Sequence, residues 1–140
     1  MTPEKDAEKA QSPLEFLQER CKDAPTPAQI DAWKQQVPNA RVQFFCPDGK
    51  RFFILRGITG LEYRAIQEFA AQNSKDPDYE FRIRLAEKAV LWTNTSGSHK
   101  LDDQQLRLGT AGLPETLHAI VSQLSDFYDP VQLFNLTADL

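Results

Sequence analysis

Two β-prone runs with a turn signal between them constrain the fold of this chain more than any other feature. The runs cover residues 41–46 and 51–55, and Pro47, Asp48 and Gly49 separate them. Turn-forming residues between two such runs are typical of a β-hairpin. The sequence therefore predicts a hairpin over about residues 41–55. Because an isolated hairpin is barely stable in water, other parts of the chain must cover it.

Both strands of this hairpin carry apolar residues at odd and at even positions. Successive side chains of a strand point to opposite faces, so both faces of the hairpin are apolar. We expect one face to pack on the rest of the domain. The other face is either covered by helices or offered to a partner.

The aromatic residues of the hairpin support two interpretations. In the first they belong to the core. In the second some of them form a docking surface, because protein interfaces favour aromatic residues at their buried centres. Under the second interpretation the candidate protein-binding residues are Phe45, Phe53 and Leu55 on one hairpin face, with Trp92 as an additional anchor.

Helix start signals precede the hairpin. Ser12-Pro13 and Thr26-Pro27 each place a capping side chain before a proline. A serine or threonine hydroxyl accepts a hydrogen bond from the first helical turn, and proline suits the first helical position. These signals predict a pair of helices within residues 12–38.

Gly57 and Gly60 follow the hairpin. They lack the spacing of a phosphate-binding loop, and we interpret them as the tight connection from a strand to a helix. Thr59 and Glu62 form a capping box that predicts the start of that helix.

The rest of the chain is predicted to be mostly helical. The apolar spacing predicts a central helix over residues 76–92, ending at Trp92, and then a long loop over residues 93–112. Two further helices are predicted to start at Pro114 and at Pro130.

The predicted fold class is α+β, a mostly helical single domain with one β-hairpin. A chain of 140 residues with 41% hydrophobic residues suits one globular domain. We expect residues 1–11 to be a flexible tail, residues 12–134 to be the globular domain, and residues 135–140 to be a loose C-terminal end.

The reactive side chains form no pattern that is typical of catalysis. His99 and His118 lie in different predicted elements, and Cys21 and Cys46 match no metal or redox spacing. Catalysis needs a nucleophile or an acid–base pair that a third group holds in place. We therefore predict no enzyme activity, no catalytic residue, no metal and no cofactor. A small hydrolase that uses His118 is the alternative from the class of enzymes.

Charge and hydropathy restrict the partners. A net charge of −4 argues against nucleic acid, which needs a concentrated basic face. The apolar runs are too short to span a membrane, and the N-terminus shows no secretory signal. We expect a protein partner, a reducing compartment and no membrane association, with an oligomer or a hetero-complex left open.

Residues 51–134 resemble the small tail-assembly chaperones and baseplate-associated proteins of tailed bacteriophages. Three features carry the resemblance: a hydrophobic strand that leads into the helix start at Thr59, the run Glu87-Lys88-Ala89-Val90-Leu91-Trp92, and Ala111-Gly112-Leu113-Pro114 opening a helix that closes at residues 124–127.

This resemblance implies a non-enzymatic role in virion assembly. Such proteins bind a tape-measure protein, a tail protein or a component of the baseplate hub in the host cytoplasm, and no cofactor is expected. The resemblance leaves open whether the chain stays in the virion as a structural subunit. The alternative function is a bacterial adaptor or regulatory domain that binds a host protein.

Overall fold

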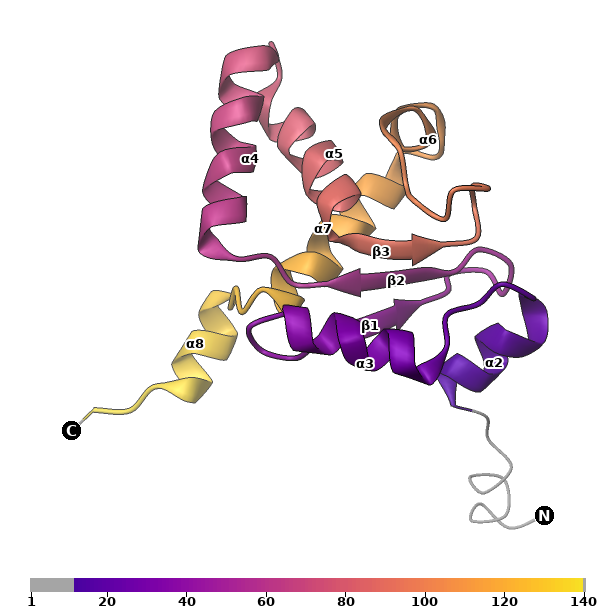
Figure 1. Cartoon of the computed structure of the whole chain (residues 1–140). Coiled ribbons are helices and arrows are strands. Elements are labelled where there is room, and N and C mark those ends of the chain that lie inside the picture. The colour runs from indigo at the N-terminus through magenta and orange to yellow at the C-terminus, as the bar shows by residue number, and fades with distance from the viewer. Residues whose placement is uncertain (1–11, 140) are drawn as a thin grey trace.

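A small antiparallel sheet lies between two layers of helices in the computed structural model, which describes residues 12–139. The strands are β1 (Val42–Phe45), β2 (Phe53–Arg56) and β3 (Val90–Thr93), in the order β1-β2-β3. The helices are α2 (Pro13–Arg20), α3 (Pro27–Gln36), α4 (Gly60–Asn73), α5 (Pro77–Ala89), α6 (Asp103–Leu108), α7 (Gly112–Leu124) and α8 (Pro130–Leu136). The α+β fold class predicted from the sequence is confirmed (Figure 1).

The predicted hairpin is present as β1 and β2, with Phe44 opposite Ile54 and Phe45 opposite Phe53. A third strand, β3, which was not predicted, pairs with the other side of β2. The central helix therefore ends at Ala89 and not at Trp92. Trp92 instead pairs with Ile54 across the sheet.

The physical reason for this difference is the unpaired side of β2. Residues 90–93 are β-branched, apolar or aromatic, and such residues favour a half-buried strand wherever a partner strand is available. Hydrogen bonding to β2 satisfies their backbone groups as well as a further helical turn does. Only the folded structure shows that β2 is the partner strand. The helix predicted from the apolar spacing was therefore too long at its C-terminal end.

Side-chain caps place most of the helix starts where the sequence predicts them. Ser12, Thr26 and Asp76 each accept a hydrogen bond from a backbone N–H in the first turn of the helix that follows. Thr59 and Glu62 form the reciprocal capping box predicted for α4. At the other end of the chain, the prediction of a loose end from residue 135 was wrong for Asn135 and Leu136, which belong to α8. The predicted tail over residues 1–11 lies outside the described residues.

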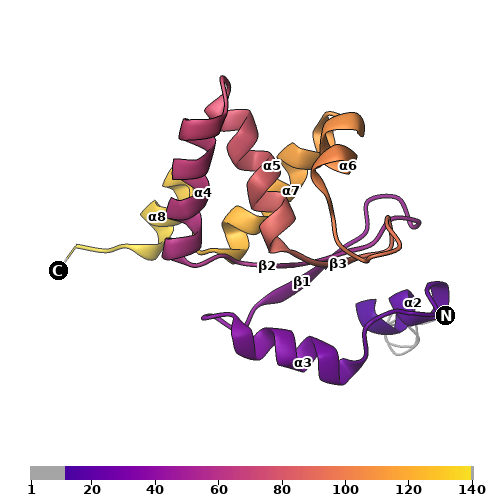
Figure 2. The ribbon, with the colours of Figure 1, turned by 45° about the horizontal axis from the view of Figure 1, so that its top comes forward.

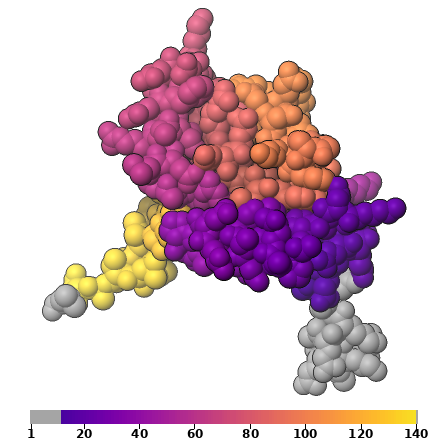
Figure 3. Space-filling model, in the orientation of Figure 1, coloured from indigo at the N-terminus to yellow at the C-terminus, as the bar shows by residue number. Residues whose placement is uncertain are grey.

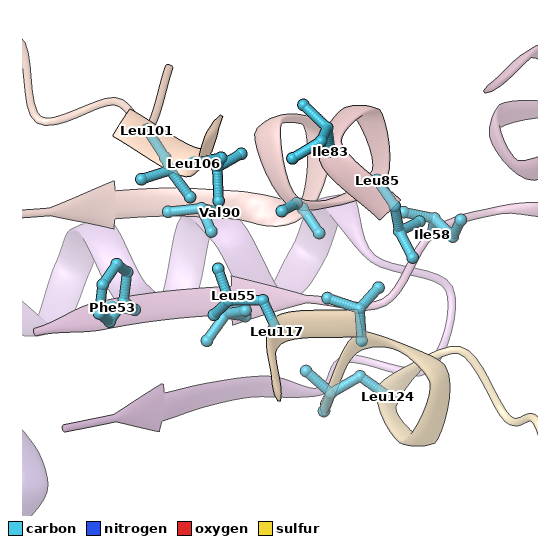
Figure 4. Close-up of a cluster of buried hydrophobic side chains, with 13 residues drawn as sticks. Phe53, Leu55, Ile58, Ile83, Leu85, Val90, Leu101, Leu106, Leu117 and Leu124 are labelled. Carbon is cyan, nitrogen blue, oxygen red and sulfur yellow. The ribbon is translucent and has the colours of Figure 1, made fainter. Parts of the chain in front are cut away.

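The main core fills the space between one face of the sheet and helices α5, α6 and α7 (Figure 4). Phe53 and Leu55 of β2 point into it and are fully buried. They meet Ile83 from α5 and Leu117 from α7, which are fully buried as well.

The opposite face of the sheet is covered by the N-terminal helices α2 and α3 (Figure 2). Leu17 of α2 is fully buried there beside Phe52, Ile54 and Trp92. Other parts of the chain therefore pack on both apolar faces of the hairpin. The sequence left open whether the second face is covered by helices or offered to a partner, and in the structure helices cover it.

Two polar contacts attach this N-terminal layer and the hairpin to the end of β3. The amide of Asn94 accepts from the backbone N–H of Phe52 at 2.8 Å and donates to the carbonyl of Lys50 at 2.9 Å. His99 stacks on Trp92 with ring centroids 5.0 Å apart, and its Nε2 lies 2.6 Å from a carboxylate oxygen of Asp23.

An ion pair joins the end of β2 to α4 and makes the fold sensitive to acid. The guanidinium of Arg56 binds both carboxylate oxygens of Glu62, at 2.9 and 2.7 Å. Mainly through these hydrogen bonds from Arg56, with help from the backbone N–H of Thr59, the pKa of Glu62 is lowered to about 2. A lowered pKa means that the folded state favours the charged carboxylate.

We expect Glu62→Gln to lower the free energy of unfolding by about 2 kcal/mol at pH 7. The contribution of Glu62 is complete above its ordinary pKa of 4.5 and is lost as the pH falls towards 2. The difference between wild type and variant in urea unfolding should therefore shrink between about pH 4.5 and pH 2.

The matched control for this substitution is Glu68→Gln. Glu68 pairs with Arg64 at 3.3 Å, but both side chains are largely exposed. Exposed pairs contribute little, so this variant should differ from wild type by less than about 0.5 kcal/mol. A constant wild-type-minus-E62Q difference from pH 7 to pH 2 would contradict the assigned role of Glu62.

Candidate protein-binding surfaces

The four residues predicted to bind a partner are packed inside the chain. Phe53 and Leu55 are fully buried in the main core, and Trp92 is 5% exposed. Phe45 is partly buried and stacks on Phe53 with ring centroids 5.9 Å apart. Trp92 lies on the opposite face of the sheet, in the cluster under α2 and α3, so it is not brought together with the other three. Of these four residues, only Phe45 is more than a few per cent exposed in this structure.

The large exposed apolar side chains gather instead in the C-terminal part of the chain. Helix α8 has seven residues, and none of them is buried. Phe134 is 81% exposed and Val131 is 70% exposed. The exposed set in this region, which we call the C-terminal apolar surface, consists of Phe127, Tyr128, Val131, Leu133, Phe134 and Leu136.

Helix α8 differs from an ordinary surface helix in having no charged face. Its sequence contains only Gln132 and Asn135 as polar residues and no charged residue. A surface helix normally places one apolar stripe on the core and charged residues towards water, whereas a helix that is apolar all round is normally buried. Helix α8 has the composition of a buried helix and the exposure of a surface helix.

The segment that leads to α8 is anchored to the body of the domain. The backbone N–H of Ile58 donates to the hydroxyl of Ser125 at 2.9 Å, and that hydroxyl donates to the carbonyl of Val121 at 2.6 Å. Phe127 lies against Tyr63 of α4, with ring centroids 5.1 Å apart. Helix α8 therefore leaves the domain from a fixed point next to α4 and α7.

Helix α8 itself is a well-formed element. The Asp129 carboxylate accepts from the backbone N–H of Gln132 at 2.8 Å, and the Gln132 side chain accepts from the backbone N–H of Asp129. This capping box satisfies backbone groups that a short helix otherwise leaves to water. In the space-filling view α8 projects from the body as a separate arm (Figure 3).

A second apolar feature lies between α4 and α5. It is an open groove of about 600 Å³ whose lining includes Leu61, Ile66 and Phe69. Leu61 is 85% exposed, and the guanidinium of Arg84 lies 4.7 Å from the ring centre of Phe69. The charged residues at its rim already have partners, since Arg84 pairs with Glu80 and Glu87. This groove is thus a more polar candidate than the C-terminal apolar surface, since charged residues line it.

The two histidines occupy packing positions. The ring of His118 lies edge-on to Phe81 with centroids 6.1 Å apart, and burial, with a smaller effect of Arg82, lowers its pKa. Both ring nitrogens of His99 are engaged, Nδ1 with the carbonyl of Thr93 and Nε2 with Asp23. Within residues 12–139 no group of three or more His, Cys, Asp and Glu side chains is arranged to hold a metal ion.

The sequence contained a signal for the C-terminal apolar surface, but the predicted helix was given no function. Four of the seven residues from Pro130 to Leu136 are large and apolar, and no charge separates them. What could not be read from the sequence was that residues 12–139 leave every residue of this helix unburied. Helix α7 ends at Leu124, and Phe127 beyond it is 47% exposed.

Comparisons with known proteins give no relative. No protein-family model, no curated protein and no solved structure matches the chain. In the part of the chain that the structure describes, no helix is long and apolar enough to cross a lipid bilayer.

Proposed function

We propose that this chain is a non-enzymatic, protein-binding component of bacteriophage tail or baseplate assembly, and that it binds its partner through α8 and the residues leading into it. The observation that carries the binding role is the C-terminal apolar surface, six large apolar side chains exposed on and beside one projecting helix. The assignment to tail assembly rests on the resemblance of residues 51–134 described above.

The exposed surface is costly for a protein that stays alone in water. Contiguous exposed apolar patches on soluble proteins mark interaction sites more often than not. Full burial of a Val, Leu or Phe side chain contributes about 1.5–3 kcal/mol. Several such side chains on one helix are enough to drive association with a complementary groove, even after the entropy lost on binding is subtracted.

The geometry fits one recurring type of recognition, in which a helix enters an apolar groove of the partner. Val131 and Phe134 are three residues apart and so lie on one side of α8. The capping box at Asp129 stabilises the first turn of the helix before binding. A preformed helix loses less conformational entropy on docking than a disordered segment does.

The test is a double substitution, Val131→Ser with Phe134→Ser, in the chain expressed in its native infected host. We expect the variant to capture tail, tape-measure or baseplate proteins at about one tenth of the wild-type amount or less. The measurement is quantitative mass spectrometry of the tagged chain and its bound proteins. Electron microscopy should show fewer complete tails in a phage that carries the double substitution.

Leu61→Ser is the matched control, since it removes an equally exposed apolar side chain from a different surface. It should leave capture and tail assembly unchanged. Complete tails in normal number from the double variant would contradict the role of α8. Specific capture of host proteins alone, lost in the double variant, would favour the adaptor alternative over phage assembly.

A further inference from the structure

The charge of the C-terminal segment restricts what covers it. Residues 125–139 contain Asp126, Asp129 and Asp139 but no lysine, arginine or histidine. The three carboxylates flank the uncharged residues of α8 on both sides along the chain. The binding segment is therefore an apolar helix between acidic ends.

Few contacts within residues 12–139 neutralise these carboxylates. Asp126 lies 3.6 Å from the guanidinium of Arg41, and both side chains are about half exposed. Asp129 is occupied as the helix cap, which uses a neutral backbone donor and leaves its charge in place. Among the described residues no cation pairs with Asp129 or Asp139, and Asp126 stays about half exposed beside Arg41. A surface that covers α8 must therefore come close to these carboxylates.

This arrangement disfavours a second copy of the chain as the occupant. Two copies that meet through α8 bring six aspartates to one small interface, in a chain whose net charge is already −4. Like charges placed together across an interface reduce affinity and select against that partner. An anionic lipid surface is disfavoured for the same reason.

We propose that the occupant is a different protein, with an apolar groove that takes Val131 and Phe134 and a rim of lysine or arginine that meets Asp126 and Asp139. This inference rests on the proposed binding role of α8 and specifies the chemistry of its partner. The apolar groove supplies most of the affinity. The basic rim determines the specificity for this partner and speeds up association at low salt.

The experiment uses two synthetic amphipathic helical peptides of equal length as probes. One combines leucine with lysine, and the other has the same leucines with glutamate in place of lysine. Binding of each labelled peptide to the full chain is followed by fluorescence anisotropy at low and at physiological salt. We expect the leucine–lysine peptide to bind at least about tenfold more tightly than the leucine–glutamate peptide.

Two pairs of substitutions, one that removes apolar side chains and one that removes negative charges, separate the apolar and the electrostatic contributions. Val131→Ser with Phe134→Ser should weaken binding of the leucine–lysine peptide at least about tenfold. Asp126→Asn with Asp139→Asn should reduce the preference for lysine over glutamate several-fold and make binding less sensitive to salt. Asparagine tolerates the backbone at residue 126, where φ is 65°.

Three outcomes would overturn the inference. Equal binding of both peptides would contradict a partner with a basic rim. Binding of the leucine–lysine peptide that survives the Val131/Phe134 double substitution would show that the peptide binds elsewhere. Dimerisation in sedimentation equilibrium, or binding to phosphatidylcholine–phosphatidylserine vesicles, would assign α8 to another occupant if either is lost in the double variant. Normal tail assembly by that variant contradicts the proposed function but does not affect the peptide preference, so the two proposals fail separately.

Discussion

Replacing Gly57 by alanine should destabilise the protein by about 3 kcal/mol or more, because there is no room for a single methyl group at this position. A Cβ at residue 57 would lie 2.3 Å from the carbonyl oxygen of Leu124 and 2.8 Å from its carbonyl carbon. Both atoms belong to the backbone at the end of α7. Relief of the clash requires the whole chain segment to move, and not only a flexible side chain.

The movement would break contacts that depend on this close approach. The carbonyl of Leu124 accepts from the side-chain amide of Asn39 at 2.8 Å, and the hydroxyl of Ser125 accepts from the backbone N–H of Ile58. These bonds join the segment before β1 and the segment after β2 to the end of α7. Chemical denaturation should show a lower midpoint with an unchanged dependence on denaturant, as expected for an altered folded state.

Gly60→Ala is the control for the loss of glycine itself. Nothing lies within 4 Å of a Cβ built at Gly60, which opens α4. Alanine should be neutral or slightly stabilising there, by up to about 1 kcal/mol. Equal effects at the two positions would show that the approach of α7 to Gly57 is not what requires glycine.

Much of the fold could be predicted from short-range signals. The caps at Ser12, Thr26, Thr59 and Asp76 act within one helical turn, so the sequence alone locates four helix starts. The interpretation of Gly57 as a tight connection from a strand to a helix also agrees with the structure, because β2 ends at Arg56 and α4 begins at Gly60. The reason for glycine at that position is a contact with Leu124, far away in the sequence.

Strand β3 was not predicted, because short-range signals do not show which segments pair across a sheet. Helical and extended states compete for residues 90–93, and pairing with β2 decides between them. The same long-range effect decides whether the residues predicted to bind a partner are accessible. The aromatic density of the hairpin is a property of the sequence, but its exposure depends on whether α2 and α3 cover the second face. They do, and Phe52 and Phe53 are buried, whereas Phe44 and Phe45 are partly buried.

The C-terminal apolar surface was missed for the opposite reason. An apolar helix near the end of a chain is normally assigned to the core, since most such helices are buried. Phe127 packs on Tyr63 of α4 and the Ser125 hydroxyl bonds to Val121 of α7, whereas no residue of α8 is buried. Site prediction from aromatic content therefore requires the contacts as well as the residue types.

Phenylalanine-to-alanine substitutions at two positions should separate folding from binding. Phe53→Ala is expected to lower the free energy of unfolding by about 3–5 kcal/mol, because Phe53 is fully buried and its removal leaves a cavity in the main core. Phe134→Ala removes the same atoms from a side chain that is 81% exposed, and should change stability by less than about 0.5 kcal/mol.

Binding should show the reverse order in conditions where both variants are folded. Phe134→Ala should weaken partner binding by about tenfold or more, whereas folded Phe53→Ala should bind as wild type does. Thermal unfolding gives the stability and establishes the temperature at which binding is compared. A loss of binding in folded Phe53→Ala with full binding in Phe134→Ala would return the site to the hairpin. The expected result assigns the hairpin aromatics to the core and the contact with the partner to α8, since the same chemical change has opposite consequences at the two positions.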